Sequence, residues 1–236
     1  MEVNIAVEKI NKYASSESGD TVEVIERPNG GLSVVMADGQ SSGRGAKWIS
    51  TLVVRKVISL LSEGIRDGAA ARAASDYLYT ERKGKVSATL NIVSIDMQTD
   101  TLVITRNNPA PVLVATNNGI HLLEEESIPI GIYRDTRPLI SELPLEVGLT
   151  VVAYTDGLVH AGSRYGEAMD VYCALEAILE EEEPTPEEIA NSLLNHALKL
   201  DRDRPTDDTS IIVIQISSHP GDLIRRMTVR LPLVRS

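Results

Sequence analysis

Val34–Gly39 (VVMADG) and Val151–Gly157 (VVAYTDG) are the two stretches that decide the fold. Each is an apolar run rich in β-branched residues, which is typical of a buried strand, and each ends in Asp-Gly, a pair that turns the chain. A carboxylate is therefore expected at the mouth of each strand, at Asp38 and Asp156. Carboxylates presented in this way favour the binding of hard cations.

Two further strands begin with acidic residues instead of ending in them. Gly19-Asp20 opens the apolar run 21–25, and the pair Asp207-Asp208 comes just before the run 211–216. Four strand ends with carboxylates indicate a site that holds more than one divalent cation.

Composition limits the class of protein. A chain of 236 residues favours one domain, or one domain with a short appendage. The formal net charge of −11 argues against a nucleic-acid partner. The first residues do not read as a targeting signal, and no apolar run approaches the ~20 residues that span a bilayer, so no membrane partner is expected and a cytoplasmic location is the simplest prediction. The absence of Phe predicts an aliphatic core.

Hydrophobic periodicity predicts a mixture of strands and helices. The strand at 21–27 and the strand at 31–38 form a hairpin, although the pattern leaves open whether Asp20 and Asp38 share one end of it. The four strands between 87 and 123 are interpreted as a meander, so the sheets should be mostly antiparallel with helices packed outside them. Strands are expected at 2–14, 21–27, 31–38, 87–96, 101–105, 112–115, 120–123, before Asp156 and at 211–216; helices are expected from about 48 to 63, at 67–80, at 166–183 and from 186 to about 200.

Three ordered motifs resemble those of a known family. MADGQSSG (36–43), YTDGL (154–158) and DDTSI (207–211) are similar to the motifs of metal-dependent PP2C-type (PPM/SpoIIE-like) bacterial serine/threonine phosphatases, most of all to the RsbX type. The resemblance extends from about residue 19 to 216. It implies an α+β fold, an αββα sandwich of mostly antiparallel sheets flanked by helix pairs. Residues 1–218 would form the phosphatase domain, and 219–236 a C-terminal extension that is an edge strand or a tail.

The resemblance also implies a set of ligands for two divalent cations, Mn²⁺ or Mg²⁺. Asp38 would contact both ions and the Gly39 carbonyl one of them; Asp20 would serve that same ion, and Asp156 and Asp207 the other. Asp38, Asp156 and Asp207 are the expected catalytic residues, with Asp208 behind the ligands. Two divalent ions about 3.5–4 Å apart can activate a water for attack on a phosphomonoester, so no protein nucleophile is needed.

The only cysteine has no place in this chemistry. Cys173 lies inside a helical pattern and is expected to be buried and structural.

Three positions depart from the family pattern or leave alternatives open. Gln40 stands where many relatives have a His that could protonate the leaving group. Gln can orient a water or a substrate oxygen but is no acid near neutral pH, so turnover should be modest. Thr21-Val22 replaces aromatic residues, so Asp20 is either a ligand or a turn residue. Arg44, at the start of the first helix, either helps to bind an anion or is a surface arginine.

The function that the resemblance implies is hydrolysis of phosphoserine or phosphothreonine on a bacterial stress-signalling protein. The partner would be a phosphorylated STAS-domain scaffold or antagonist, as in stressosome signalling. Two alternatives stay open: a PP2C-like binding module with weak or no turnover, and a metal-dependent hydrolase of small phosphoesters. The alternating segment 223–235 is either an edge strand or a docking element.

Overall fold

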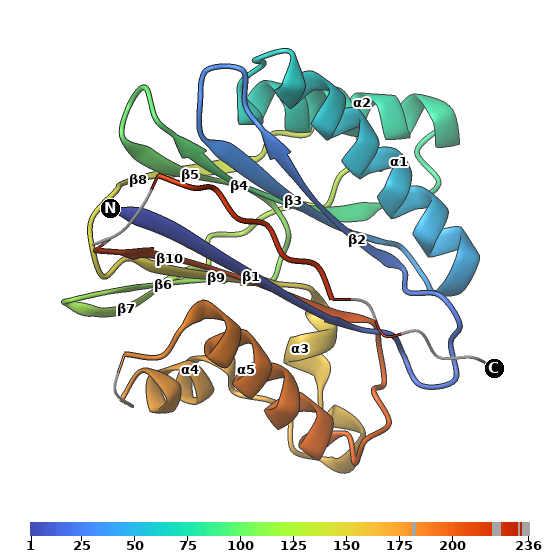
Figure 1. Ribbon diagram of the computed structural model, residues 1–236. Helices are drawn as coiled ribbons and strands as arrows, with labels where there is room; N and C mark the ends of the chain where they lie inside the picture. The colour runs from blue at the N-terminus through green and yellow to red at the C-terminus, as the bar shows by residue number, and fades with distance from the viewer. Residues whose placement is uncertain (181–182, 219–222, 231, 233–236) are drawn as a thin grey trace.

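The computed structural model describes residues 1–180, 183–218, 223–230 and 232. Its elements form four layers, with two sheets in the middle and helices against the outer face of each (Figure 1). The first sheet has the strand order β2-β3-β4-β5-β8, and the second sheet has the order β1-β10-β9-β6-β7. Neighbouring strands are antiparallel in both sheets. The predicted αββα sandwich is confirmed.

The elements have the following bounds. The strands are β1 (Glu2–Ile10), β2 (Asp20–Glu26), β3 (Leu32–Gly39), β4 (Ala88–Asp96), β5 (Thr101–Asn107), β6 (Val112–Thr116), β7 (Gly119–Leu123), β8 (Leu139–Pro144), β9 (Thr150–Tyr154) and β10 (Thr209–Ser217). The α-helices are α1 (Gly43–Ser62), α2 (Asp67–Arg82), α3 (Asp156–His160), α4 (Val171–Leu179) and α5 (Pro186–Leu200). A short 3-10 helix covers Ser163–Tyr165.

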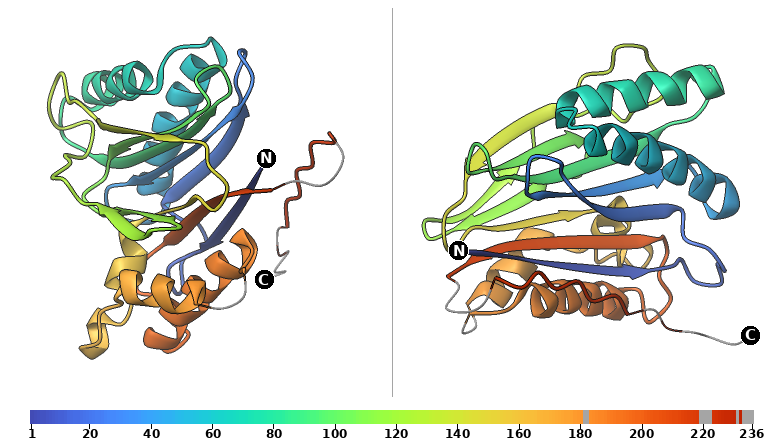
Figure 2. Two further views of the ribbon diagram at one scale, coloured as in Figure 1. Left: turned by 90° about the vertical axis from the view of Figure 1, so that its left-hand side faces the viewer. Right: turned by 45° about the horizontal axis from the view of Figure 1, so that its top comes forward.

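Three apolar layers hold the sandwich together, and strand β3 contributes to two of them. Val34 and Met36 point between the two sheets, while Val35 and Ala37 point toward α1 and α2. This alternation follows from the two-residue period of a strand that is buried on both faces. A third layer joins the second sheet to α3, α4 and α5. Figure 2 shows the same layers from two other sides.

The register of the β2–β3 hairpin settles the question that the sequence left open. Asp20 pairs directly with Asp38, so both aspartates lie at the same end of the first sheet. Because directly opposed residues have Cβ atoms only about 5 Å apart, two carboxylates are forced together there.

Helix ends follow local capping chemistry. Thr185 and Glu188 form the predicted capping box ahead of Pro186, so α5 begins where the sequence indicates. The helix expected at 166–183 is shorter, because the Asp170 side chain caps α4 by accepting from the backbone N–H of Cys173. Gly166, with a positive φ of 85°, stands before it.

The prediction that Cys173 is buried is wrong. The side chain is exposed, because the buried face of α4 is set by Val171 and Leu175 and residue 173 lies on the other side of the helix.

The predicted meander is also wrong in its pairing. β4 pairs with β5 in the first sheet and β6 with β7 in the second, so the chain changes sheet between β5 and β6. Three elements were not predicted from the sequence: β8, an edge strand that pairs only with β5 in the first sheet; α3, which follows β9 after Thr155; and the short 3-10 helix at Ser163–Tyr165.

The end of the chain forms no strand where the structure describes it. Residues 223–230 run outside the sandwich without regular secondary structure (Figure 2). Arg225 contacts Glu26 at 3.5 Å. Residues 219–222, 231 and 233–236 of the predicted extension lie outside the described part, and its assignment as an edge strand or a tail stays a prediction. Within that part, no helix combines the length and the apolar character needed to cross a bilayer.

Candidate metal centre at the strand ends

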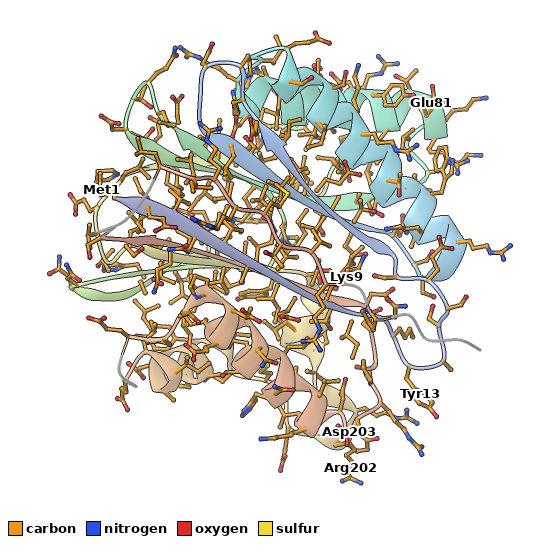
Figure 3. The ribbon with its side chains drawn as sticks, viewed as in Figure 1. Met1, Lys9, Tyr13, Glu81, Arg202 and Asp203 are labelled. Atoms are coloured by element: carbon orange, nitrogen blue, oxygen red, sulfur yellow. The ribbon has the colours of Figure 1, made fainter. Side chains whose placement is uncertain are left out.

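Four predicted ligands meet at one end of the sandwich, two from the first sheet and two from segments next to strands of the second sheet. Asp20 opens β2, and Asp38 is the last residue but one of β3. Asp156 begins α3 directly after β9, while Asp207 precedes β10, and β9 and β10 are neighbours in the second sheet. Lys9, labelled in Figure 3, lies near the end of β1 and donates to the Asp20 carbonyl oxygen.

The protonation of Asp38 reflects how closely the acidic groups approach. Burial, followed by the negative charges of Asp20, Asp156 and Asp207, raises the pKa of Asp38 from 3.8 to about 9. Near neutral pH this carboxyl therefore holds a proton unless a cation replaces it. The raised pKa of Asp38 therefore shows that the other three carboxylates lie close to it.

Asp20 is held by hydroxyl groups from the opposite sheet. Its Oδ2 accepts hydrogen bonds from Thr155 Oγ1 at 3.0 Å and Ser210 Oγ at 2.7 Å. Its Oδ1 is buried and has no hydrogen-bond partner. Burial raises the pKa of Asp20, and the hydrogen bond from Ser210 opposes that shift. A protonated Asp38 carboxyl can donate a hydrogen bond to the Asp20 carboxylate, and a cation would take the place of that proton.

Two lysines converge on the backbone of the same aspartate. Lys9 Nζ and Lys47 Nζ donate to the Asp20 carbonyl oxygen at 2.6 and 2.8 Å, and Lys47 also reaches Thr21 Oγ1 at 2.9 Å. Burial, followed by the charge of Lys47, lowers the pKa of Lys9. These ammonium groups fix the start of β2 and offset part of the negative charge of the cluster.

Asp207 and Asp208 have different tasks. Asp207 Oδ1 accepts from the N–H of Asp208 at 3.0 Å, and burial raises its pKa. Asp208 is buried, and its two oxygens accept from the backbone N–H groups of Lys12 at 2.9 Å and Gly19 at 2.8 Å. Asp208 therefore fixes the loop that leads into Asp20.

Both Asp-Gly glycines are required by close packing. A Cβ at Gly157 would lie 2.1 Å from the Asp208 carbonyl oxygen, and one at Gly39 would lie 2.1 Å from that of Ala46. Gly157 therefore lets the β9–α3 turn lie against the strand that follows Asp207, and Gly39 lets the first turn of α1 lie against the end of β3.

The arrangement fits divalent cations by its donor set. Among the described residues, no group of three or more His, Cys, Asp or Glu side chains is arranged as a finished metal site. Oxygen donors, a raised pKa at Asp38 and an unpartnered Oδ1 at Asp20 suit Mg²⁺ or Mn²⁺.

Gln40 and Arg44 take no part in this cluster. Gln40 Oε1 accepts from the N–H of Ser87 at 2.9 Å, and the Gln40 N–H donates to the Ser87 carbonyl, which joins the end of β3 to the start of β4. Arg44 is exposed. Its role in anion binding stays a prediction.

Sequence reasoning missed the residues that position Asp20. Thr155 and Ser210 stand inside two of the recognised motifs, and a hydroxyl beside an acidic residue was the available signal. Lys9 and Lys47 carried no signal, because only the fold brings β1 and α1 to the start of β2.

Comparisons with known proteins place this geometry in a family. The family model described as "Stage II sporulation protein E (SpoIIE)" matches residues 28–217. The chain belongs to the SpoIIE family. Stage II sporulation protein E of Bacillus subtilis is 20% identical over 201 residues, which are 84% of this chain and 24% of that protein. The chain thus spans about a quarter of the length of this relative.

Solved structures share the PP2C fold of this SpoIIE-family chain. The PP2C phosphatase domain of Bacillus subtilis SpoIIE, with a fragment of its regulatory domain, matches with a TM-score of 0.79 at 19% identity, over 93% of this chain and 64% of that one. RsbX in complex with magnesium matches with a TM-score of 0.70 at 19% identity, over 91% of this chain and 96% of that one. The catalytic domain of the serine/threonine phosphatase PstP in complex with two manganese ions matches with a TM-score of 0.68 at 15% identity, over 92% of this chain and 99% of that one.

Removing the hydroxyls that hold Asp20 should weaken metal binding. For Thr155→Val combined with Ser210→Ala, we expect Mn²⁺ affinity to fall about 10–100-fold, the usual cost of removing groups that orient metal ligands. Isothermal titration calorimetry measures this directly. Ser217→Ala, at the far end of β10, is the control; equal affinity in the double variant and the wild type would show that the hydroxyls do not position a ligand.

Proposed function

We propose that this SpoIIE-family chain is a Mn²⁺- or Mg²⁺-dependent serine/threonine protein phosphatase. The observation that carries the proposal is the meeting of Asp20, Asp38, Asp156 and Asp207 at one end of a PP2C fold, with the Asp20 Oδ1 atom buried and unpartnered. An all-oxygen set of this kind suits two divalent cations.

Each residue has a distinct role in the proposed site. Asp38, between the other carboxylates, would hold both ions with help from the Gly39 carbonyl; Asp20 would bind one of them, and Asp156 and Asp207 the other. Bound divalent cations would supply a water activated for attack and neutralise the phosphoryl oxygens. The chain itself orients the ligands through Thr155, Ser210 and Asp208, and provides no nucleophile of its own.

The substrate class is the finer part of the proposal. By the resemblance to the RsbX type, the phosphoserine or phosphothreonine would lie on a STAS-domain scaffold or antagonist of bacterial stress signalling. One observation favours a second candidate, a PP2C-like binding module with weak turnover: Gln40 occupies the position of the proton donor, and its side-chain carbonyl is engaged by Ser87.

A single assay separates these functions. Hydrolysis of p-nitrophenyl phosphate and of a phosphorylated STAS domain is measured with Mn²⁺ and with EDTA. We expect both substrates to be hydrolysed with Mn²⁺ and the rates to fall about 10³-fold or more on chelation, because the uncatalysed reaction is very slow. Activity that survives chelation would refute the proposal. Activity on the small ester alone would indicate a hydrolase of small phosphoesters, and binding of the STAS domain without turnover the binding module.

A further inference from the structure

A groove of about 550 Å³ opens beside the candidate metal centre. It lies between the start of α1 and the connection from α2 to β4. Gln40, which follows the proposed ligand Gly39 in the chain, forms part of its wall, so the groove begins next to the metal ligands. Its lining consists of Gln40, Ser41, Gly45, Ile49, Glu81, Arg82, Lys83, Lys85 and Val86.

The charge of this groove is opposite to that of the whole protein. Arg82, Lys83 and Lys85 outnumber the one acidic lining residue, Glu81, whereas the chain as a whole carries −11. All three cations are exposed, and within the described residues none of them forms a salt bridge. Figure 3 labels Glu81 near the end of α2, at the edge of the molecule. The groove therefore offers cations to an incoming anion.

The local structure holds the Arg82 side chain and the backbone that carries the two lysines. The Arg82 guanidinium stacks on the Trp48 ring at 4.0 Å, which leaves the edges of its planar fork open to a carboxylate. Lys83 has a positive φ of 54°, and the N–H of Lys85 donates to the Arg82 carbonyl at 3.1 Å, so the turn has a fixed shape. Prior fixing of the chain lowers the entropic cost of binding.

We propose that this groove binds acidic residues next to the phosphorylated serine or threonine of the substrate. The inference rests on the proposed phosphatase function, since the phosphoryl group must lie at the metal centre for a flanking residue to reach the groove. An extended peptide advances about 3.3 Å per residue, so a neighbour within a few positions can enter it. Ile49 and Val86 supply an apolar surface for the aliphatic part of a Glu side chain.

Hydrolysis of matched phosphopeptides tests this specificity. With Mn²⁺, we expect kcat/KM for a phosphoserine peptide flanked by Glu to exceed that for the same peptide flanked by Ala by about tenfold, as a few partly exposed charge pairs provide. Arg82→Glu with Lys85→Glu should abolish or reverse this ratio, and Glu81→Gln should increase it. Arg55→Glu with Arg72→Glu makes the same change in net charge at exposed helix positions outside the groove and should leave the ratio unchanged. Hydrolysis of p-nitrophenyl phosphate, which has no flanking residue, should be equal in all variants.

A binding measurement keeps the test independent of turnover. Trp48 is the only tryptophan and contacts Arg82, so its fluorescence reports occupation of the groove. In EDTA, an unphosphorylated Glu-rich peptide should change this signal in the wild type and in the Arg55/Arg72 control, but not in the Arg82/Lys85 variant. Loss of all hydrolysis with this binding intact would refute the phosphatase function alone. Equal kcat/KM for the two peptides, or a fluorescence change that survives in the Arg82/Lys85 variant, would refute the groove.

Discussion

Asp38→Asn should abolish Mn²⁺-dependent hydrolysis and, in EDTA at pH 8, make the protein more stable. Activity should fall about 10³-fold or more, because the residue proposed to hold both ions loses its charge. Stability should rise because the native fold disfavours the ionised form of this group, whose pKa is about 9. An amide carries no charge at any pH and can donate a hydrogen bond to a neighbouring carboxylate.

The size of the stabilisation follows from the pKa shift. Each pKa unit corresponds to about 1.4 kcal/mol, and we expect at least about 2 kcal/mol after allowing for relaxation around the group. In a protein of this size that equals about 4–8 °C in melting temperature. Thermal unfolding followed by circular dichroism, with p-nitrophenyl phosphate hydrolysis on the same samples, measures both effects. Asp203→Asn, at an exposed aspartate outside the cluster, should change neither. An Asp38→Asn variant that is active, or less stable than the wild type in EDTA, would contradict this assignment.

The metal-free protein should lose stability as pH rises, and Mn²⁺ should reverse that trend. A carboxyl whose folded pKa lies above its unfolded value binds its proton more tightly in the native state. Its stabilising contribution is complete below pH 3.8 and is lost as pH rises toward about 9 for Asp38, and burial raises the pKa of Asp20 and Asp207 in the same direction. Cations compete with these protons, so they bind better at higher pH.

The measurement compares melting temperatures at pH 5.5 and pH 8 with EDTA and with Mn²⁺. In EDTA we expect a lower melting temperature at pH 8; the increase caused by Mn²⁺ should be clearly larger at pH 8 than at pH 5.5, and at 100 times the dissociation constant it amounts to about 2.7 kcal/mol per site. The Asp38→Asn protein should show a smaller form of both effects, because Asp20 and Asp207, whose pKa values burial also raises, remain. An increase that does not depend on pH would mean that Mn²⁺ binds away from the buried carboxyls.

The fold was predictable because its strands carry strong local signals. Two β-branched runs ending in Asp-Gly, the turn before β3 and the capping box at Thr185 each specify structure within a few residues. That β5 and β6 lie in different sheets was not predictable, since strands adjacent in sequence gave no sign that the chain changes sheet between them. Strand β8 was missed because a short, half-exposed edge strand that ends in proline has a weak pattern.

The candidate site likewise has residues that the sequence predicted and residues that it did not. The aspartates were recognisable because they lie in motifs, whereas the residues that contact them were not. Thr155 and Ser210 donate hydrogen bonds to the Asp20 carboxylate, and two lysines from other elements donate to its backbone carbonyl. Burial of Cys173 was predicted wrongly because a helical pattern alone did not reveal which face packs inward. The groove at Arg82 could not be predicted from the sequence, because three cations at a helix end and in the following loop have the pattern of any solvent-exposed turn.

Anomalous diffraction from a crystal soaked in Mn²⁺ tests the central claim most directly. We predict two manganese peaks between the sheets, the first within coordination distance of Asp20, Asp38 and the Gly39 carbonyl, and the second of Asp38, Asp156 and Asp207. A crystal saturated with Mn²⁺ that shows no peak beside these residues, or peaks only elsewhere on the molecule, would contradict it.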